Sequence, residues 1–432
     1  MTAVVRGAAA IRTAAALGAF DAVGPVILVA VASVVAPSLA AAEPAAPATE
    51  ASDEVTADQA VALYRERSPR LAASRAAIDV TAADLVDAAI YPNPTLSLDT
   101  TNIVQGQDTF GHSQELAGID VPILIGGQRG HRARAAEARI AARRAELEVD
   151  QARAEIEIRR RFLSLLAAQQ RAAALATALD DATAVRAIVA GRQQAGAKSP
   201  YELERTELAL AAIASKRDEA GTEITAAAGA LAAAVGIPGW LPRAAGGFEP
   251  PAPASSAGPA AEHPALLAGV AAAAAARQDQ AAARAEAVPT PSLQLQGLAT
   301  TDPQGIALTV GISLPLPVFD RNQGAIARAR AQQRAAELEH RAAGVELAAD
   351  LARAAAVEAA RCDAVARFRA GAIERLPRVR TMAEASYRSG QGGIVELLDA
   401  LDAITEARLR DIELVASALD AELDVRAAAR GR

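Results

Sequence analysis

The chain carries one series of short motifs twice, with a spacing of about 194 residues. The counterparts, in chain order, are residues 68–71 and 263–266, residues 91–98 and 288–295, residues 121–123 and 314–316, Gly196 and Gly390, and Glu202-Leu203 and Glu396-Leu397. Landmarks that recur in the same order indicate a duplicated structural unit rather than a chance match between Ala-rich segments. We therefore expect one arrangement used twice, with two strand hairpins and two helical hairpins in each chain.

Composition shifts divide the chain into four parts. A basic start, an apolar run at 24–35 and small residues at 38–42 are typical of a secretory signal peptide. No later stretch reaches about 18 strongly apolar residues, so no membrane-spanning helix is expected in the mature chain. The predicted organisation is a signal peptide at 1–42, a first repeat at 43–235, a Pro/Gly-rich linker at 236–262 and a second repeat at 263–432.

The apolar content of the chain comes mainly from alanine. Hydrophobic residues make up 52% of the sequence, but aromatic residues only 3%. Alanine has the highest helix propensity and buries little area, so this composition favours long, closely packed helices over a thick globular core. The net charge of −7 lacks the basic excess that is typical of nucleic-acid-binding proteins, and we expect no nucleic acid among the partners.

Pro- and Gly-rich segments separate six predicted helices. These run approximately over 56–89, 128–191, 201–235, 264–287, 320–389 and 394–429. The two longest have about 65 residues and would each span about 100 Å at 1.5 Å per residue. Their small residues allow close helix packing, and their charged residues suit either the wall of a hydrated tunnel or an exposed coiled coil.

Four predicted strands of about ten residues alternate in polarity. They run approximately over 95–104, 113–123, 292–300 and 306–316, with a turn at 301–305. In the last strand, apolar side chains from Ile306 to Leu314 alternate with small or polar ones. In the third, a slip at Gly297 would place Leu298 on the face of Leu295. Long strands with one apolar face favour a lipid-facing barrel with a wet interior, and a soluble sheet with one buried face stays open as the alternative.

A barrel of this kind needs more than one copy of the chain. Four strands cannot close in a membrane, where the smallest barrels have eight. An open sheet edge in lipid leaves unpaired backbone groups that cost several kcal/mol each. Two copies would supply eight strands and three copies twelve. Tyr91, Phe110 and Phe319 fall at strand ends, where interfacial aromatic residues belong.

Residues for catalysis or metal binding are scarce. Cys362, the single cysteine, lies in an Ala-rich helical run and is expected to be a small buried residue rather than part of a disulfide. The four histidines have no ligand spacing. Residues 126–130 follow a strand and precede a helix but lack the glycine spacing of a phosphate loop, and a turn with positive φ explains them better. We therefore expect no enzyme activity, no cofactor and no protein-built metal site.

Three segments resemble the TolC-type outer-membrane factors, the outer membrane efflux protein family: residues 91–94, residues 314–324 and residues 387–400. Residues 315–324 are most similar to the cation-efflux, CzcC-like branch. The resemblance covers nearly the whole mature chain. It implies an α+β membrane protein in the cell outer membrane, with four strands per protomer in a trimeric twelve-stranded β-barrel and long helical hairpins that form a barrel in the periplasm. It also implies a homotrimer that contacts outer-membrane lipid, a periplasmic adaptor (membrane fusion protein) and an inner-membrane RND-type pump.

The resemblance places functional residues at the turns of the helical hairpins. Gly196 and Gly390 match the turns where adaptors dock, and Tyr387 matches a tyrosine that holds the periplasmic entrance closed. Glu396 and Asp399 match acidic positions that line this entrance. An arginine of the best-known members is replaced here by Gly392, so their closing network is not reproduced.

The spacing at this turn has its own consequence. Glu396 and Asp399 are three residues apart, so they share one helix face. Threefold symmetry would gather six carboxylates, and such a ring attracts cations. The alternative is a solvated helix end, where acidic residues are favoured by the helix dipole.

The sequence thus favours a passive outer-membrane exit duct in a tripartite efflux system. Its cargo is expected to be divalent heavy-metal cations because of the motif at 315–324. Drug efflux and type I protein secretion are alternatives within the duct hypothesis. A periplasmic coiled-coil structural protein without a pore is the alternative outside it.

Overall fold

The computed structural model describes residues 53–102, 113–194, 200–251, 262–301 and 304–430. The first repeat contains β1 (Glu54–Val55), α1 (Ala57–Arg67), α2 (Pro69–Ala89), β2 (Thr95–Asn102), β3 (Ser113–Pro122), α3 (Gln128–Gln194) and α4 (Pro200–Val235). The rest contains β4 (Arg243–Ala244), α5 (Pro264–Ala285), β5 (Ser292–Thr301), β6 (Gln304–Ser313), α6 (Gln323–Gly371), the 3-10 turn η1 (Ile373–Arg375), α7 (Leu376–Ser389) and α8 (Ile394–Arg430). The expected signal peptide at 1–42 and Phe110 lie outside the described residues.

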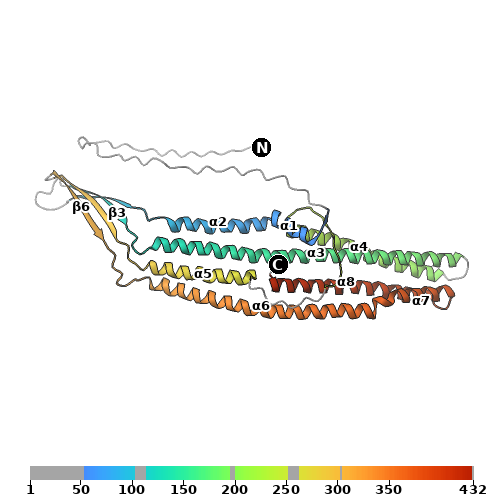
Figure 1. Ribbon diagram of the computed structural model, residues 1–432. Coiled ribbons are helices and arrows are strands. Elements are labelled where there is room, and N and C mark those ends of the chain that lie inside the picture. Colours follow the sequence, from blue (N-terminus) through green and yellow to red (C-terminus); the bar gives the residue numbers. More distant parts are fainter. Residues whose placement is uncertain (1–52, 103–112, 195–199, 252–261, 302–303, 431–432) are drawn as a thin grey trace, which may run out of the picture. The chain divides into compact units, whose positions relative to one another are not determined.

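The two hairpins form one antiparallel four-stranded sheet in the order β2-β3-β5-β6 (Figure 1). Their registers are equivalent. Thr95 lies opposite Asp120 in the first hairpin, and the equivalent Ser292 lies opposite Ser313 in the second. The duplication seen in the sequence is therefore preserved residue by residue in the sheet. In the described residues, β2 and β6 each pair with one strand only, so both outer edges of the sheet are open.

One face of this sheet is apolar and uncovered. It carries the exposed side chains Leu96, Leu98, Ile119, Leu295, Ile306, Leu308, Val310 and Ile312. Ile306 is 90% exposed and Ile312 78% exposed. The opposite face carries polar groups, among them Asp120, whose carboxylate accepts hydrogen bonds from Ser292 (2.8 Å) and Gln294 (3.0 Å). The predicted alternation of polarity is thus present in the sheet.

The expected slip at Gly297 is wrong. Pairing runs without interruption along β5, where Gly297 lies opposite Ala117 on one side and Leu308 on the other. Leu298 consequently lies on the face of Gln296, opposite Leu116 and Ala307. A glycine in a strand fits a regular ladder as well as a bulge, so the residue type alone did not decide the register.

The expected helix at 56–89 is two helices. Ser68 ends α1 and begins α2, and its hydroxyl accepts a hydrogen bond from the Leu71 amide (3.4 Å). Pro69 occupies the first turn of α2, where its missing N–H costs nothing.

The expected helix at 320–389 is also interrupted. α6 ends at Gly371, and α7 starts after the 3-10 turn Ile373–Arg375. Pro377 explains the break, because it has no N–H for the carbonyl of residue 373 and its ring clashes with that carbonyl in a continuous helix. The equivalent helix α3 has no proline and runs unbroken over 67 residues.

The described part of the expected linker, residues 236–251, is an ordered strap. β4 pairs in parallel with β1, and the Ala244 amide donates to the side chain of Gln169 on α3 (2.9 Å). Trp240 is buried in the core formed by α1, α3 and α4. Glu249 reaches Arg369 on α6 (2.8 Å). The strap therefore ties the first repeat to the second.

α3 is the central helix of the fold. It packs against α2, α4, α5 and α8, and its buried side chains extend from Gln128 to Val189. In the described parts of the chain, none of the helices combines the length and apolar character needed to cross a membrane. The sheet lies at one end of α3, and the turn between α7 and α8 lies near its other end (Figure 1).

Candidate functional site at the helical turns

The turn between α7 and α8 is built on Gly390. This residue has a φ of 80° and ends α7 in the left-handed region, which glycine adopts without strain. The carbonyl of Ser386 accepts hydrogen bonds from the amides of Gln391 and Gly392, both at 3.1 Å. Gly196, the equivalent turn residue of the first repeat, lies outside the described residues.

Tyr387 is buried in the helical end rather than presented at its surface. Its side chain is 1% exposed and packs with Val185 and Val189 of α3 and Leu397 of α8. Its hydroxyl donates a hydrogen bond to Glu202 at the start of α4 (2.9 Å). Burial, together with this hydrogen bond, raises the pKa of Tyr387. The phenol is therefore neutral and remains a donor at physiological pH.

Arg192 holds the same tyrosine from the other side. Its guanidinium carbon lies 5.0 Å from the centre of the Tyr387 ring, a cation–π contact. It also donates to the carbonyls of Tyr387 (2.8 Å) and Arg388 (2.9 Å). These carbonyls belong to the last turn of α7, where the Tyr387 carbonyl also accepts from the Gly390 amide (3.1 Å). The arginine therefore adds a cap to the end of α7 from the neighbouring hairpin.

Arg192 and Glu202 were not predicted from the sequence as partners of Tyr387. Both come from the first repeat, nearly two hundred positions from the tyrosine. No local spacing connects them. The sequence identifies Glu202 only as the counterpart of Glu396.

An ion-pair chain continues from Tyr387 along α7. Arg380 pairs with Glu384 of its own helix (3.0 Å) and with Asp181 of α3 (2.8 Å), and Glu384 also reaches Arg388 (3.2 Å). The hydrogen bonds and charges of Glu384 and Asp181 raise the pKa of Arg380. α7 is thus attached to α3 by the Arg380–Asp181 pair and, at its end, by Arg192.

Glu396 and Asp399 do not join this network. Both are exposed on α8. One oxygen of Glu396 accepts from the Gly393 amide (3.1 Å), a local cap of the α8 N-terminus. Within the residues that the structure describes, Asp399 makes no hydrogen bond or ion pair. The two carboxylates stand on one helix face, separate from buried Tyr387.

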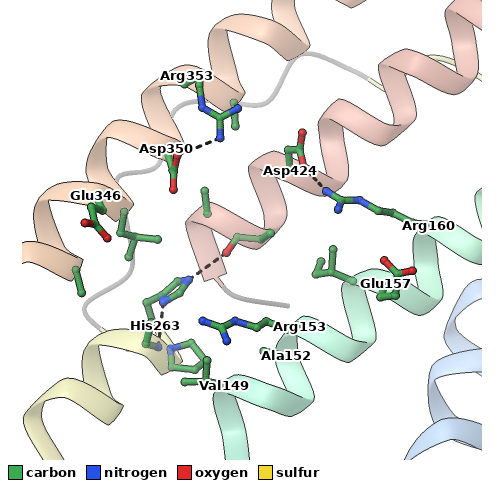
Figure 2. Close-up of a pocket in the computed structure, with 18 residues that line it drawn as sticks. Val149, Ala152, Arg153, Glu157, Arg160, His263, Glu346, Asp350, Arg353 and Asp424 are labelled. Carbon is green, nitrogen blue, oxygen red and sulfur yellow. Dashed lines mark hydrogen bonds and ion pairs between the residues drawn. The ribbon is translucent and has the colours of Figure 1, made fainter. Parts of the chain in front are cut away.

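A cavity of about 510 Å³ lies between α3, α5, α6 and α8 (Figure 2). Its charged side chains are partly paired, Arg160 with Asp424 and Arg353 with Asp350. His263, on the wall of the cavity, accepts from the Ala265 amide (3.2 Å) through Nδ1 and donates through Nε2 to the Ala427 carbonyl (3.0 Å). This histidine links the start of α5 to the end of α8, so its role at the cavity is structural. In the described segments, His, Cys, Asp and Glu side chains do not gather in threes to hold a metal ion.

Comparison with known proteins gives consistent results in sequence and fold. Residues 260–430 match the family described as outer membrane efflux protein. The chain is 25% identical over 367 residues to the cobalt-zinc-cadmium resistance protein CzcC of Cupriavidus metallidurans, covering 84% of this chain and 86% of that protein.

Solved channel structures share the fold. The crystal structure of CusC matches with a TM-score of 0.71 and 16% identity, over 87% of this chain and 92% of that one. The outer membrane protein VceC of Vibrio cholerae matches with a TM-score of 0.66 and 16% identity, over 86% and 95%. The chain thus shares its fold with these membrane proteins.

Proposed function

We propose that this chain is an outer membrane efflux protein and that three copies of it form a passive exit duct for divalent heavy-metal cations. An RND-type inner-membrane pump and a periplasmic adaptor would deliver the cations. The duct itself would catalyse no reaction and couple no energy.

The observation that carries this proposal is the sheet. It has one uncovered apolar face and two unpaired edges. Lipid accommodates such a face but not such edges, because unpaired backbone groups are costly there. Neighbouring copies that pair β6 with β2 would remove both edges. Three copies supply twelve strands, within the range of transmembrane barrels.

The metal cargo is a separate part of the proposal. It follows from the likeness to the cobalt-zinc-cadmium resistance protein and from the motif at 315–324. We assign the periplasmic entrance to Tyr387, Glu396 and Asp399. Docking of the adaptor is assigned to the turns at Gly196 and Gly390.

Deletion of the gene tests the cargo. We expect the deletion strain to tolerate several-fold less zinc, cobalt or cadmium, and a plasmid copy to restore growth. Copper and a panel of drugs serve as comparison. Unchanged tolerance to the metals together with new drug sensitivity would contradict the metal assignment and leave the duct itself standing.

A further inference from the structure

The sheet has two open edges, and the pairing at its centre indicates how a second copy of the chain can pair with them. β2 forms one edge and β6 the other. The centre of the sheet contains a joint of the same kind. There β3, the second strand of one hairpin, pairs with β5, the first strand of the next. A second copy that follows β6 with its own β2 would repeat this joint.

The internal repeat supplies the register of the repeated joint. The hairpin registers coincide when Thr95 is matched to Ser292 and Asp120 to Ser313. With the same matching, Pro122 of β3 corresponds to Pro315, just after β6. Pro122 lies opposite Ser292 in the β3–β5 joint. Transferred to the edge, this pairing places Pro315 opposite Thr95 of the next copy.

We infer that β6 pairs with β2 of a second copy of this chain in this one register, with Ser313 opposite Ser97 and Ile312 opposite Leu98. The inference rests on the proposed oligomer and adds to it the residue pairs of its seam. Its faces agree, because Ile312 and Leu98 both belong to the uncovered apolar face, 78% and 74% exposed. A slip of one residue would move every apolar side chain of β2 to the polar face.

The register also predicts how the polar face continues around the seam. Asp120 at the central joint is hydrogen bonded by Ser292 and Gln294. The equivalent positions at the seam hold Ser313, Thr95 and Ser97. In a trimer, three carboxylate sites would therefore alternate with three sites that carry only hydroxyl groups.

The spacing of the paired residues makes the seam accessible to disulfide trapping. At the central joint, the amide of Ile123 donates to the carbonyl of Pro291 (2.7 Å), so these two residues form a hydrogen-bonded pair. The two pair types alternate along an antiparallel joint, so Asp120 and Gln294, three positions further along, form a closer, non-hydrogen-bonded pair. Ser313 and Ser97 occupy the equivalent positions at the seam and are of this type. Their Cα atoms would lie about 4.5 Å apart, within the range of disulfides.

The test uses the full-length chain with Cys362→Ser, which removes the single native cysteine. We expect Ser97→Cys with Ser313→Cys to convert most of the chain in outer-membrane fractions to covalent oligomers that collapse on reduction. Either cysteine alone should give none. Leu98→Cys with Ser313→Cys, on opposite faces, is the matched control. Ser97→Cys with Gly311→Cys reports a two-residue slip, and the space beside Gly311 admits a side chain.

The outcomes separate the register from the oligomer. Faster trapping of the Gly311 pair, or of the opposite-face control, would overturn the register. Glutaraldehyde on the same membranes reports assembly independently. Trimers with glutaraldehyde but no disulfide at the Ser97–Ser313 pair would also overturn the register while the proposed duct stands. Single chains under both treatments would overturn the duct as well.

Discussion

The two repeats have the same order of elements, yet their long helices are not equivalent. α3 is continuous and has buried side chains along its length. α6 is interrupted by η1 before α7, and its buried residues are only Ala329, Ala354, Glu358 and Val365. Duplication has thus preserved the register of the strands but not the surroundings of the helices. The first repeat supplies a central support, and the second supplies the more exposed helix.

The residues near the turns of the two helical hairpins also differ between the repeats. Tyr387 of the second repeat corresponds to Gln193 of the first, and Arg192 corresponds to Ser386. Glu202 binds the hydroxyl of Tyr387, whereas its counterpart Glu396 caps its own helix. The second turn is therefore held by side chains of the first. If these turns form the proposed entrance, its opening would separate α7 from α3 at these contacts.

The largest expected effect breaks α7 itself. Ala385→Pro removes a hydrogen bond inside α7 and costs about 3 kcal/mol in local helix stability. Ala385 is exposed, so no core contact is lost. We expect heat-resistant trimers in the outer membrane but metal tolerance as low as in the deletion strain. Ala385→Ser is the control and should behave as wild type. Loss of the trimers themselves would show that α7 is needed for assembly rather than for efflux.

The sequence predicted the strands of the sheet, but it did not predict the contacts at the turn between α7 and α8. Alternating polarity predicted all four strands, because most side chains on one face of a strand share one environment. The breaks at Pro69 and Pro377 had a signal in the sequence, but a long Ala-rich run outweighed it. The partners of Tyr387 had none. Arg192 meets the tyrosine through packing of the two hairpins, and spacing along the chain does not encode such a contact.

The second prediction concerns Arg192, which attaches the end of α7 to the first repeat. Arg192→Met keeps the length of the side chain but deletes two hydrogen bonds from a charged donor and the cation–π contact. The loss should weaken the attachment of α7 by about 2 kcal/mol. We expect the mean conductance in planar bilayers to rise several-fold.

A matched arginine serves as the control for this substitution. Arg353→Met removes an exposed pair with Asp350 (3.0 Å) three residues away on α6. Such pairs contribute little, so the conductance should not change. Equal conductance in wild type and Arg192→Met would mean that the contact does not restrict the entrance.

A smaller effect is expected from the exposed carboxylates. Glu396→Gln together with Asp399→Asn removes two charges per chain from one face of α8. If these residues line the entrance, the preference for potassium over chloride should fall a few-fold in reversal-potential measurements. Glu413→Gln on the same helix, whose carboxylate already pairs with Arg410 (2.9 Å), is the control. An unchanged preference would favour a solvated helix end over an entrance ring.

The smallest effect concerns the protonation of Tyr387 and should be invisible at neutral pH. Its pKa is raised in the folded chain by burial and by Glu202, above the ordinary value of 10.0. The folded state therefore holds the phenolic proton more tightly than the unfolded state, and the resulting stabilisation is complete below about pH 10. It is lost as the pH rises through the folded pKa, when a phenolate forms beside Glu202. Burial also raises the pKa of Tyr64. Two of the four tyrosines should therefore ionise late in an ultraviolet titration, and Tyr387→Phe should remove one of these two late ionisations. A late phase of unchanged amplitude in this variant would mean that Tyr387 does not ionise late, and it would contradict the contact between its hydroxyl and Glu202.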